Sequence, residues 1–316
     1  MFEQAKKIIE ESNTIYIVAH VNPDGDAIGS TFAIYFALKK MGKDAHVVMP
    51  DHSTVFDFLP RIDEHVKTID VESYDLLIAL DSSDNTRLAI PREDYDKAKK
   101  IIMLDHHQVT NPYGDFIHID DTRSSASEIA YIFLKYITDN NIDKDMATML
   151  YTGIMTDTGC FNYNNTSART MRVVAELLDI GAENFLVNKK INDTIQESKL
   201  RLVAKTIDNI ESFYDNKLKY SYVSYDEIHA LGISDEDAEG MTNYLRSIAG
   251  TEFAVYVRGK SDGSIKVSMR SGGRVDVSKV AIEFGGGGHP RAAGYTMQDP
   301  YEIGKEKLIK AIGEMI

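Results

Sequence analysis

The chain is short of cysteine, of long apolar runs and of positive charge. It has 316 residues and a single cysteine, Cys160, which excludes an internal disulfide framework and fits a reducing cytoplasm. No apolar run approaches the roughly 20 residues that a membrane-spanning helix requires. Residues 1–11 follow the pattern of an amphipathic helix and not that of a secretion signal. These absences predict a soluble cytoplasmic protein without a membrane partner.

Negative charge is in excess, with 49 acidic against 35 basic residues and a net charge of −14. Proteins that hold long duplex nucleic acid neutralise many phosphates with basic side chains, so duplex DNA is not an expected partner. A small phosphorylated ligand remains compatible, because residues 258–291 carry seven cations and three anions. We interpret this stretch as a local basic face, or as charges that protect the edge of a sheet.

Acidic and histidine residues follow apolar runs at several places in the first half of the chain. Because the carboxyl ends of parallel strands meet at one edge of a sheet, we expect these side chains to converge. Packed carboxylates repel unless cations neutralise them, and imidazole with carboxylate suits manganese, zinc or iron better than calcium. Each cluster alone would be structural or solvated, but together they predict metal-assisted hydrolysis, most naturally at phosphorus. The residues are His20, Asp24 and Asp26 after 14–19, Asp81 after 75–80, Asp105, His106 and His107 after 101–104, and Asp157 within 153–159.

The chain reads as two α/β domains. Alternating strand and helix patterns from residue 14 to about 158 predict a parallel sheet with helices, followed by further helices up to 191. Residues 193–205 read as a polar helix that bridges to a smaller mixed α/β domain. We therefore expect a catalytic domain at 1–190, a helical linker at 191–212 and a second domain at 213–316. The expected strands are 14–19, 45–49, 76–80, 101–104, 116–119, 218–224, 252–258, 265–270 and 293–297, and the expected helices are 26–41, 125–138, 145–156, 167–180, 182–191, 235–248, 277–284 and 300–315.

These motifs resemble those of the DHH phosphoesterase family. The resemblance lies in H-x-x-P-D-x-D-A-x-G-S at 20–30, the strand-end Asp81, D-H-H at 105–107 and D-T-G at 157–159. The segment 285–294 is similar to the glycine-rich motif of the DHH-associated C-terminal domain. Pro290 and Arg291 stand where that family more often has a lysine after the histidine. The resemblance implies hydrolysis of short oligoribonucleotides to mononucleotides and of 3′-phosphoadenosine 5′-phosphate (pAp) to AMP.

The resemblance also implies a site for two divalent metal ions, which we expect to be Mn²⁺, with Co²⁺, Fe²⁺ and Mg²⁺ as alternatives. It gives His20 and Asp24 to one ion, gives Asp26, His106 and Asp157 to the other, and makes Asp81 the bridge between them. It makes His107 a contact to phosphate or a proton donor to the leaving oxygen. Asp105 would orient an imidazole.

A second site is expected around the glycine run. The backbone N–H groups of Gly286, Gly287 and Gly288 can approach a phosphate closely, although a plain hairpin would also explain these residues. The resemblance makes Arg270, Ser271 and His289 contacts to the far phosphate or base of the substrate. Tyr256 or another aromatic side chain would stack a base.

The expected partner is short single-stranded RNA or a small nucleotide. The sequence leaves the oligomeric state open, with a homodimer as one possible form. One alternative is hydrolysis of cyclic di-AMP or linear pApA, which the sequence does not separate from the first function. Inorganic pyrophosphatase ranks lower, because relatives with that activity have a different second domain. A non-enzymatic nucleotide sensor also ranks low, because all six expected ligand positions are filled.

Overall fold

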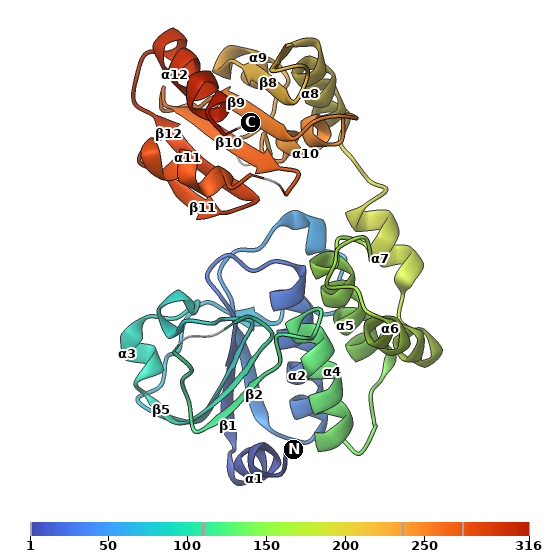
Figure 1. Cartoon of the computed structure of the whole chain (residues 1–316). Coiled ribbons are helices and arrows are strands. Elements are labelled where there is room, and N and C mark those ends of the chain that lie inside the picture. The colour runs from blue at the N-terminus through green and yellow to red at the C-terminus, as the bar shows by residue number, and fades with distance from the viewer. Residues whose placement is uncertain (1, 109–110, 236, 274, 316) are drawn as a thin grey trace. The chain divides into compact units, whose positions relative to one another are not determined.

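The computed structural model describes residues 2–108, 111–235, 237–273 and 275–315 (Figure 1). The chain divides into two compact units, Met1–Thr194 and Ile195–Ile316. Each unit contains a six-stranded sheet. The predicted fold class is confirmed, because the first sheet is parallel and carries helices while the second is mixed.

The first sheet has the strand order β3-β2-β1-β4-β5-β6, and each of its pairings is parallel. The chain builds outward from β1 on one side and then from β4 on the other, so the order reverses between β1 and β4. In open sheets of this kind, ligands bind beyond the carboxyl ends of the strands at such a reversal. The strands are β1 (Thr14–Val18), β2 (Asp44–Val48), β3 (His65–Val66), β4 (Tyr74–Leu80), β5 (Ala98–Asp105) and β6 (Phe116–Ile119).

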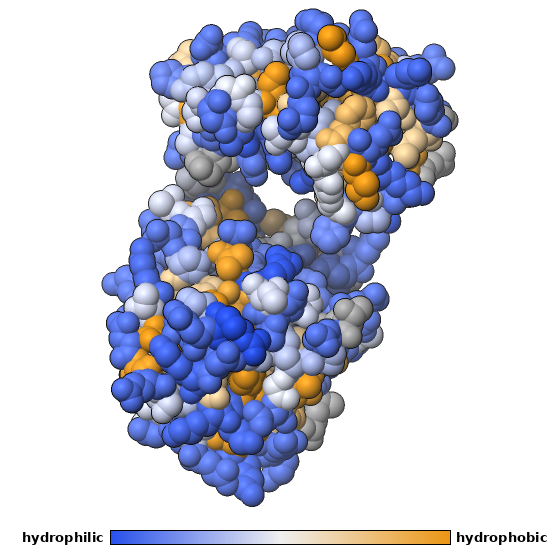
Figure 2. Space-filling model, turned by 90° about the vertical axis from the view of Figure 1, so that its left-hand side faces the viewer, coloured by the Kyte–Doolittle hydropathy of each residue, from blue (hydrophilic) through white to orange (hydrophobic). Residues whose placement is uncertain are grey.

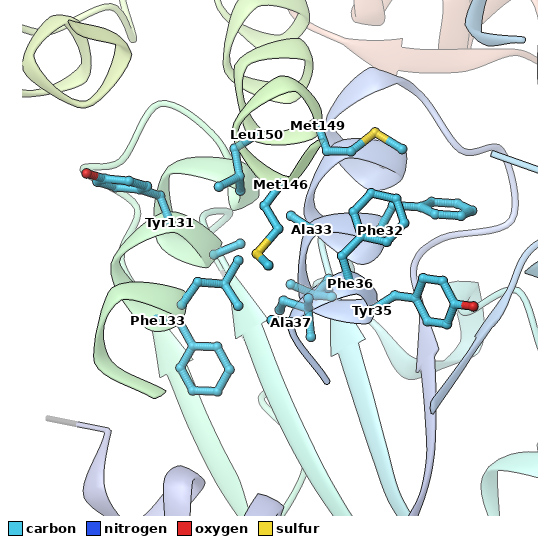
Figure 3. Packing of buried hydrophobic residues seen from close by; sticks show 14 of the residues in the cluster. Phe32, Ala33, Tyr35, Phe36, Ala37, Tyr131, Phe133, Met146, Met149 and Leu150 are labelled. Atoms are coloured by element: carbon cyan, nitrogen blue, oxygen red, sulfur yellow. The ribbon is translucent and has the colours of Figure 1, made fainter. Parts of the chain in front are cut away.

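Helix α2 (Gly25–Lys40) lies at the centre of the first unit. Its residues from Gly25 to Leu38 are all buried, as expected for a helix that is apolar on every side. Figure 3 shows Phe32 and Ala33 of this helix among core side chains of the helices beside it. The other helices of the unit are α1 (Glu3–Glu11), α3 (Arg92–Tyr95), α4 (Ala126–Ile137), α5 (Lys144–Asp157), α6 (Ala168–Ile180) and α7 (Asn184–Ile191).

Helices α2 and α5 approach each other at glycines. A Cβ atom placed on Gly29 would lie only 2.4 Å from the carbonyl oxygen of Met149 and 3.0 Å from the nitrogen of Gly153. A Cβ on Gly153 would lie 2.8 Å from Oδ1 of Asp26. The backbones of the two helices are therefore close together where α2 and α5 carry Asp26 and Asp157.

The second sheet has the order β11-β12-β10-β9-β8-β7, in which only β8 and β9 pair in parallel. Helices α11 and α12 pack on one face, around Val267, Met269 and Leu308. Helices α8 and α10 pack on the other face. The elements are α8 (Glu197–Asp208), β7 (Ile210–Phe213), β8 (Leu218–Val223), α9 (Tyr225–Ala230), α10 (Met241–Arg246), β9 (Phe253–Gly259), β10 (Ile265–Ser271), α11 (Val277–Glu283), β11 (Gly287–His289), β12 (Ala292–Met297) and α12 (Tyr301–Gly313).

Some elements differ from the sequence-based prediction. The helix expected at 235–248 forms only as α10, because Gly240 before it has a left-handed φ of 85°. The polar helix expected as a bridge is α8, and Leu202 of this helix lies in a core of the second unit. The short strands β3, β7 and β11 were not predicted, since two to four residues are too few for a recognisable alternation.

The surface shown in Figure 2 is mainly hydrophilic, with apolar residues in small separate groups. Among the helices that the structure describes, none has the combination of length and apolar character that crossing a bilayer would need.

Candidate metal centre

The first part of the centre follows β1. His20 pairs with Leu88 in an isolated bridge, and Asp24 caps the N-terminus of α2. One oxygen of Asp24 accepts hydrogen bonds from the N–H groups of Asp26 and Ala27, both at 3.0 Å. Nε2 of His20 lies 4.0 Å from Oδ1 of Asp24. The strand end and the helix start thus present an imidazole and a carboxylate to one point.

Asp26 is held at the N-terminus of α4. Its Oδ2 accepts a hydrogen bond from the N–H of Ala126 at 2.6 Å, and its Oδ1 accepts one from Ser127 at 2.8 Å. The side chain is only 1% exposed. Burial, together with the negative charges of Asp81 and Asp157, still raises the pKa of Asp26 well above its ordinary value. A neighbouring cation would therefore stabilise this carboxylate.

Asp81 lies between two histidines. It follows β4 directly and has a left-handed φ of 52°, which costs a residue other than glycine roughly 1–2 kcal/mol. Its Oδ2 is 3.6 Å from Nε2 of His20, and its Oδ1 is 3.5 Å from Nε2 of His106. Burial opposes ionisation, but contacts with His106 and His20 hold the pKa of Asp81 below its usual range. Oδ2 of this carboxylate thus faces His20, and Oδ1 faces the D-H-H segment, where Nδ1 of His107 also lies at 3.5 Å.

The D-H-H segment gives its three side chains different surroundings. Asp105 is fully buried at the end of β5, and its Oδ1 lies 2.8 Å from Nδ1 of His107 and accepts the backbone N–H of that residue at 2.9 Å. The imidazole that Asp105 orients is therefore that of His107. The side chain of His107 is 53% exposed, and its contact with Asp105 raises its pKa. Nδ1 of His107 also lies 3.5 Å from Oδ1 of Asp81. His106 points toward Asp81, Asp26 and Asp157.

Asp157 completes the group from the last residue of α5. Its Oδ2 lies 3.8 Å from Nε2 of His106, which is 3.9 Å from Oδ2 of Asp26. Burial raises the pKa of Asp157 to about 6. Burial alone would lower the pKa of His106, but contact with Asp81 and the charge of Asp26 raise it to about 10. Protons on Asp157 and His106 would thus neutralise part of the negative charge of these carboxylates when no metal ion is bound.

Arg270 and His289 share one face of the second sheet. Arg270 of β10 is paired with Ala292 of β12, which is paired with His289 of β11. Residues that are directly opposite each other in adjacent strands point to the same face. The same register places Gly287 on that face, one row along. The structure therefore brings Arg270, His289 and Gly287 together.

The glycines of this segment differ in what the fold requires of them. A Cβ on Gly286 would lie 2.3 Å from the carbonyl oxygen of Gly294, and one on Gly288 would lie 2.5 Å from that of Ala292. Gly288 also has a φ of 140°. A Cβ on Gly287 would meet no atom within 4 Å. The packing of β11 on β12 thus explains Gly286 and Gly288 but not Gly287.

Two residues expected in the substrate site lie elsewhere. Ser271 alternates with Arg270 along β10, is 4% exposed, and its Oγ accepts the N–H of Gly273 at 3.1 Å. Tyr256 is 1% exposed and packs among core residues such as Met241, so the prediction that it stacks a base is wrong. Neither side chain is presented on the exposed part of the sheet.

Comparison with known proteins agrees with the motifs. Residues 14–154 match the N-terminal domain of the DHH family, and residues 215–316 match the DHHA1 domain. The bifunctional oligoribonuclease and PAP phosphatase NrnA of Thermus thermophilus is 32% identical over 306 residues, which are 95% of this chain and 89% of that protein. The chain belongs to the DHH family. The resemblance seen in the sequence is thereby confirmed.

Two further proteins match nearly the whole chain. The crystal structure of an exopolyphosphatase-related protein from Bacteroides fragilis has a TM-score of 0.89 and 27% identity, and the match covers 99% of this chain and 95% of that one. The cyclic-di-AMP phosphodiesterase PdeA of Listeria monocytogenes is 24% identical over 97% of this chain, which is only 48% of that protein.

The acidic and histidine residues at the carboxyl edge of the first sheet have the chemistry of a divalent-metal site. Three sets of residues each offer ligand atoms that lie within 4.8 Å of one another. Buried Oδ1 of Asp81 has no hydrogen-bond partner among the described residues, as expected for an atom that binds a cation. The sets are His20 with Asp24 and Asp81, Asp26 with His106 and Asp157, and Asp81 with Asp105, His106 and His107.

Asn165 is a residue of the centre that the motifs did not reveal. Its Nδ2 donates to the carbonyl oxygen of Asp157 at 3.1 Å and to Oδ2 of the same residue at 3.3 Å. It also donates to the carbonyl oxygen of Ser124 at 2.9 Å. Asn165 thus positions Asp157, but in the sequence it stands among cap residues before α6, and that context gives no sign of this contact.

Proposed function

We propose that this DHH-family protein hydrolyses short oligoribonucleotides to mononucleotides and pAp to AMP in a metal-dependent reaction. The observation that carries the proposal is the place of Asp81, with one carboxylate oxygen toward His20 and the other toward His106. Such an arrangement suits two cations that share one carboxylate. The name of the Thermus relative supports the two substrates.

The proposed ligand sets follow the geometry. His20 and Asp24 would hold one ion, His106, Asp26 and Asp157 would hold the other, and Asp81 would serve both. We propose Mn²⁺, because mixed imidazole and carboxylate ligands favour it over the harder Ca²⁺. When bound, a pair of such ions stabilises charge on the phosphoryl oxygens and lowers the pKa of an attacking water.

His107 is proposed to act on the substrate and not as a ligand. Asp105 holds its Nδ1, which leaves Nε2 of a half-exposed ring to meet the substrate. The contact with Asp105 raises the pKa of His107 and favours the imidazolium form. An imidazolium can stabilise a phosphate oxygen or give its proton to the leaving oxygen.

The second unit is proposed to bind the far end of the substrate. Arg270 and His289 flank the small residue Ala292, and Gly287 leaves the next row open. A guanidinium and an imidazole at this spacing can both donate hydrogen bonds to a phosphate or to the acceptor atoms of a base. Of Gly286, Gly287 and Gly288, only Gly287 is at a position where packing does not require glycine. This supports the proposal that a ligand comes close to the backbone there.

A second candidate function is hydrolysis of cyclic di-AMP or linear pApA. The match to the Listeria enzyme favours it, although the chain spans only 48% of that protein. This candidate would use the same metal centre.

The test is a side-by-side rate comparison with metal-free protein that is reloaded with Mn²⁺, Co²⁺, Fe²⁺ or Mg²⁺. The substrates are pAp, RNA of two to five nucleotides, cyclic di-AMP, pApA and pyrophosphate. We expect turnover of pAp and short RNA with Mn²⁺ and none after chelation. A kcat/KM for cyclic di-AMP or pApA that exceeds the values for pAp and short RNA would favour the second candidate. Hydrolysis of pyrophosphate alone would overturn both candidate functions.

A further inference from the structure

A pocket in the first unit lies beside the strands that carry the metal centre. It has a volume of about 290 Å³ and is lined by Ser83, Asp84, Arg87, Gln108 and Asn111. The first three follow β4, which leads to Asp81, and the other two follow β5, which leads to the D-H-H segment. The pocket therefore lies at the same carboxyl edge of the sheet where ligands are expected to bind.

Arg87 is the only cation among the residues that line this pocket. Its side chain is exposed and, within the part of the chain that the structure describes, has no ion pair or side-chain hydrogen bond. The next cations behave differently: Arg92 and Lys97 each lie within 2.8 Å of a carboxylate. In a chain with a net charge of −14, an unpaired guanidinium beside an acidic centre is available to an anionic ligand.

The loop that carries Arg87 is tied to both neighbouring strand ends. The N–H of Val21, next to His20, donates to the carbonyl oxygen of Arg87 at 2.9 Å. The hydroxyl of Tyr113 donates to the carbonyl oxygen of Ser82 at 2.9 Å and so connects the two loops. The charge of Arg87 is close enough to oppose protonation of His20. Its backbone is thus fixed relative to the metal centre.

We propose that Arg87, with the amides of Gln108 and Asn111, forms a phosphate subsite beside the centre. It would bind the phosphate that neighbours the one under attack, and in this respect it rests on the proposed function. A planar guanidinium can donate two parallel hydrogen bonds to a phosphate, and the amides add neutral donors. Because the subsite and the centre belong to one unit, their spacing is fixed, and such spacing selects nucleotides with two phosphates.

The test compares Arg87→Gln with Arg92→Gln, which removes the same charge from an ion pair with Asp96. With Mn²⁺ and pAp, we expect Arg87→Gln to raise KM by about 10- to 100-fold, the effect of losing a charge-assisted hydrogen bond, with kcat within about threefold. The KM of Arg87→Lys should lie between those of the wild type and Arg87→Gln, and the KM of Arg92→Gln should match that of the wild type. Equal effects of Arg87→Gln and Arg92→Gln, or a loss confined to kcat, would overturn the subsite.

Inhibition measurements separate this proposal from the proposed function. Adenosine 3′-phosphate and pAp are tested as inhibitors of bis-p-nitrophenyl phosphate hydrolysis, which requires no turnover of pAp. Adenosine 3′-phosphate lacks the 5′-phosphate that Arg87 would bind. We expect Arg87→Gln to weaken inhibition by pAp at least tenfold and inhibition by adenosine 3′-phosphate less than threefold. Equal weakening of both would mean that Arg87 binds the 3′-phosphate that they share, and the subsite would be wrong. A wild-type enzyme that turns over neither pAp nor RNA would instead refute the proposed function, and the inhibition ratio would still decide on Arg87.

Discussion

The carboxyl edge of the first sheet and the face of the second sheet that carries Arg270 and His289 are built in different ways. At the first, buried carboxylates are held by backbone groups from distant segments, as when Ala126 and Ser127 hold Asp26. At the second, strand register places the half-buried Arg270 and the exposed His289 on one face. In the proposed function, the first region carries out the chemistry, which needs fixed distances, and the second recognises the substrate, which needs only the right groups on one side. The two regions should therefore respond differently to substitution.

The largest effect is expected at the carboxylate between the two histidines. Asp81→Ala should reduce kcat by at least about 10³-fold, comparable to the loss of a principal electrostatic stabiliser, because among the described residues only Asp81 faces both His20 and His106. Steady-state kinetics with saturating Mn²⁺ measures it, and metal content by elemental analysis should fall in parallel. A kcat within about tenfold of the wild type would remove Asp81 from its central role.

A smaller effect is expected at the half-exposed imidazole. His107→Ala should lower kcat by about 10²-fold or more, in the range of general acid–base catalysis, while the metal content stays at the wild-type level. The reason is that the ring nitrogen of His107 is closer to Asp105, at 2.8 Å, than to Asp81 of the centre, at 3.5 Å. Loss of one equivalent of metal would show instead that His106 and His107 have exchanged the proposed roles.

The second sheet should give a selective effect. His289→Ala or Arg270→Ala should reduce kcat/KM on pAp and dinucleotides by about 10- to 100-fold, because a charge-assisted contact remote from the reacting phosphorus is lost. Hydrolysis of bis-p-nitrophenyl phosphate, which is too small to need this face, serves as the internal comparison and should change little. Equal losses on both kinds of substrate would mean that the two regions are not separate in function.

The smallest expected effect concerns the stability of the first region. Buried Glu128 of α4 accepts hydrogen bonds from Ser124 and Thr170 and pairs with Arg123. Burial opposes ionisation, but these contacts lower its pKa, so its stabilisation is present above the unfolded-state pKa and is lost as the pH falls through the folded value. Glu128→Gln should cost roughly 1–3 kcal/mol at pH 7, and the difference from the wild type should shrink in acid. Urea unfolding at several pH values measures it, and a difference independent of pH would contradict the assignment.

The sequence predicted which side chains of the candidate metal centre lie close together, because they follow strand ends in short motifs. The contacts that hold those side chains were not predictable, since the N–H groups that bind Asp26 lie 100 residues away and Asn165 resembles an ordinary cap residue. Arg87 was missed because an unpaired cation is recognisable only when its neighbours are known. The prediction for Tyr256 failed because a polar aromatic in a strand has the same pattern whether its face is exposed or covered by helices.

The glycine contacts between α2 and α5 bear on how this enzyme tolerates change. Since backbone meets backbone at Gly29 and Gly153, the separation of the two helices does not depend on the size of the apolar side chains around them. We therefore expect substitutions of core side chains to lower the free energy of unfolding without changing the distance between Asp26 and Asp157. Adding one methyl group at Gly153, by contrast, would press on Asp26 and Ser127 at once. The distance between Asp26 and Asp157 is thus set mainly at two positions without side chains, Gly29 and Gly153.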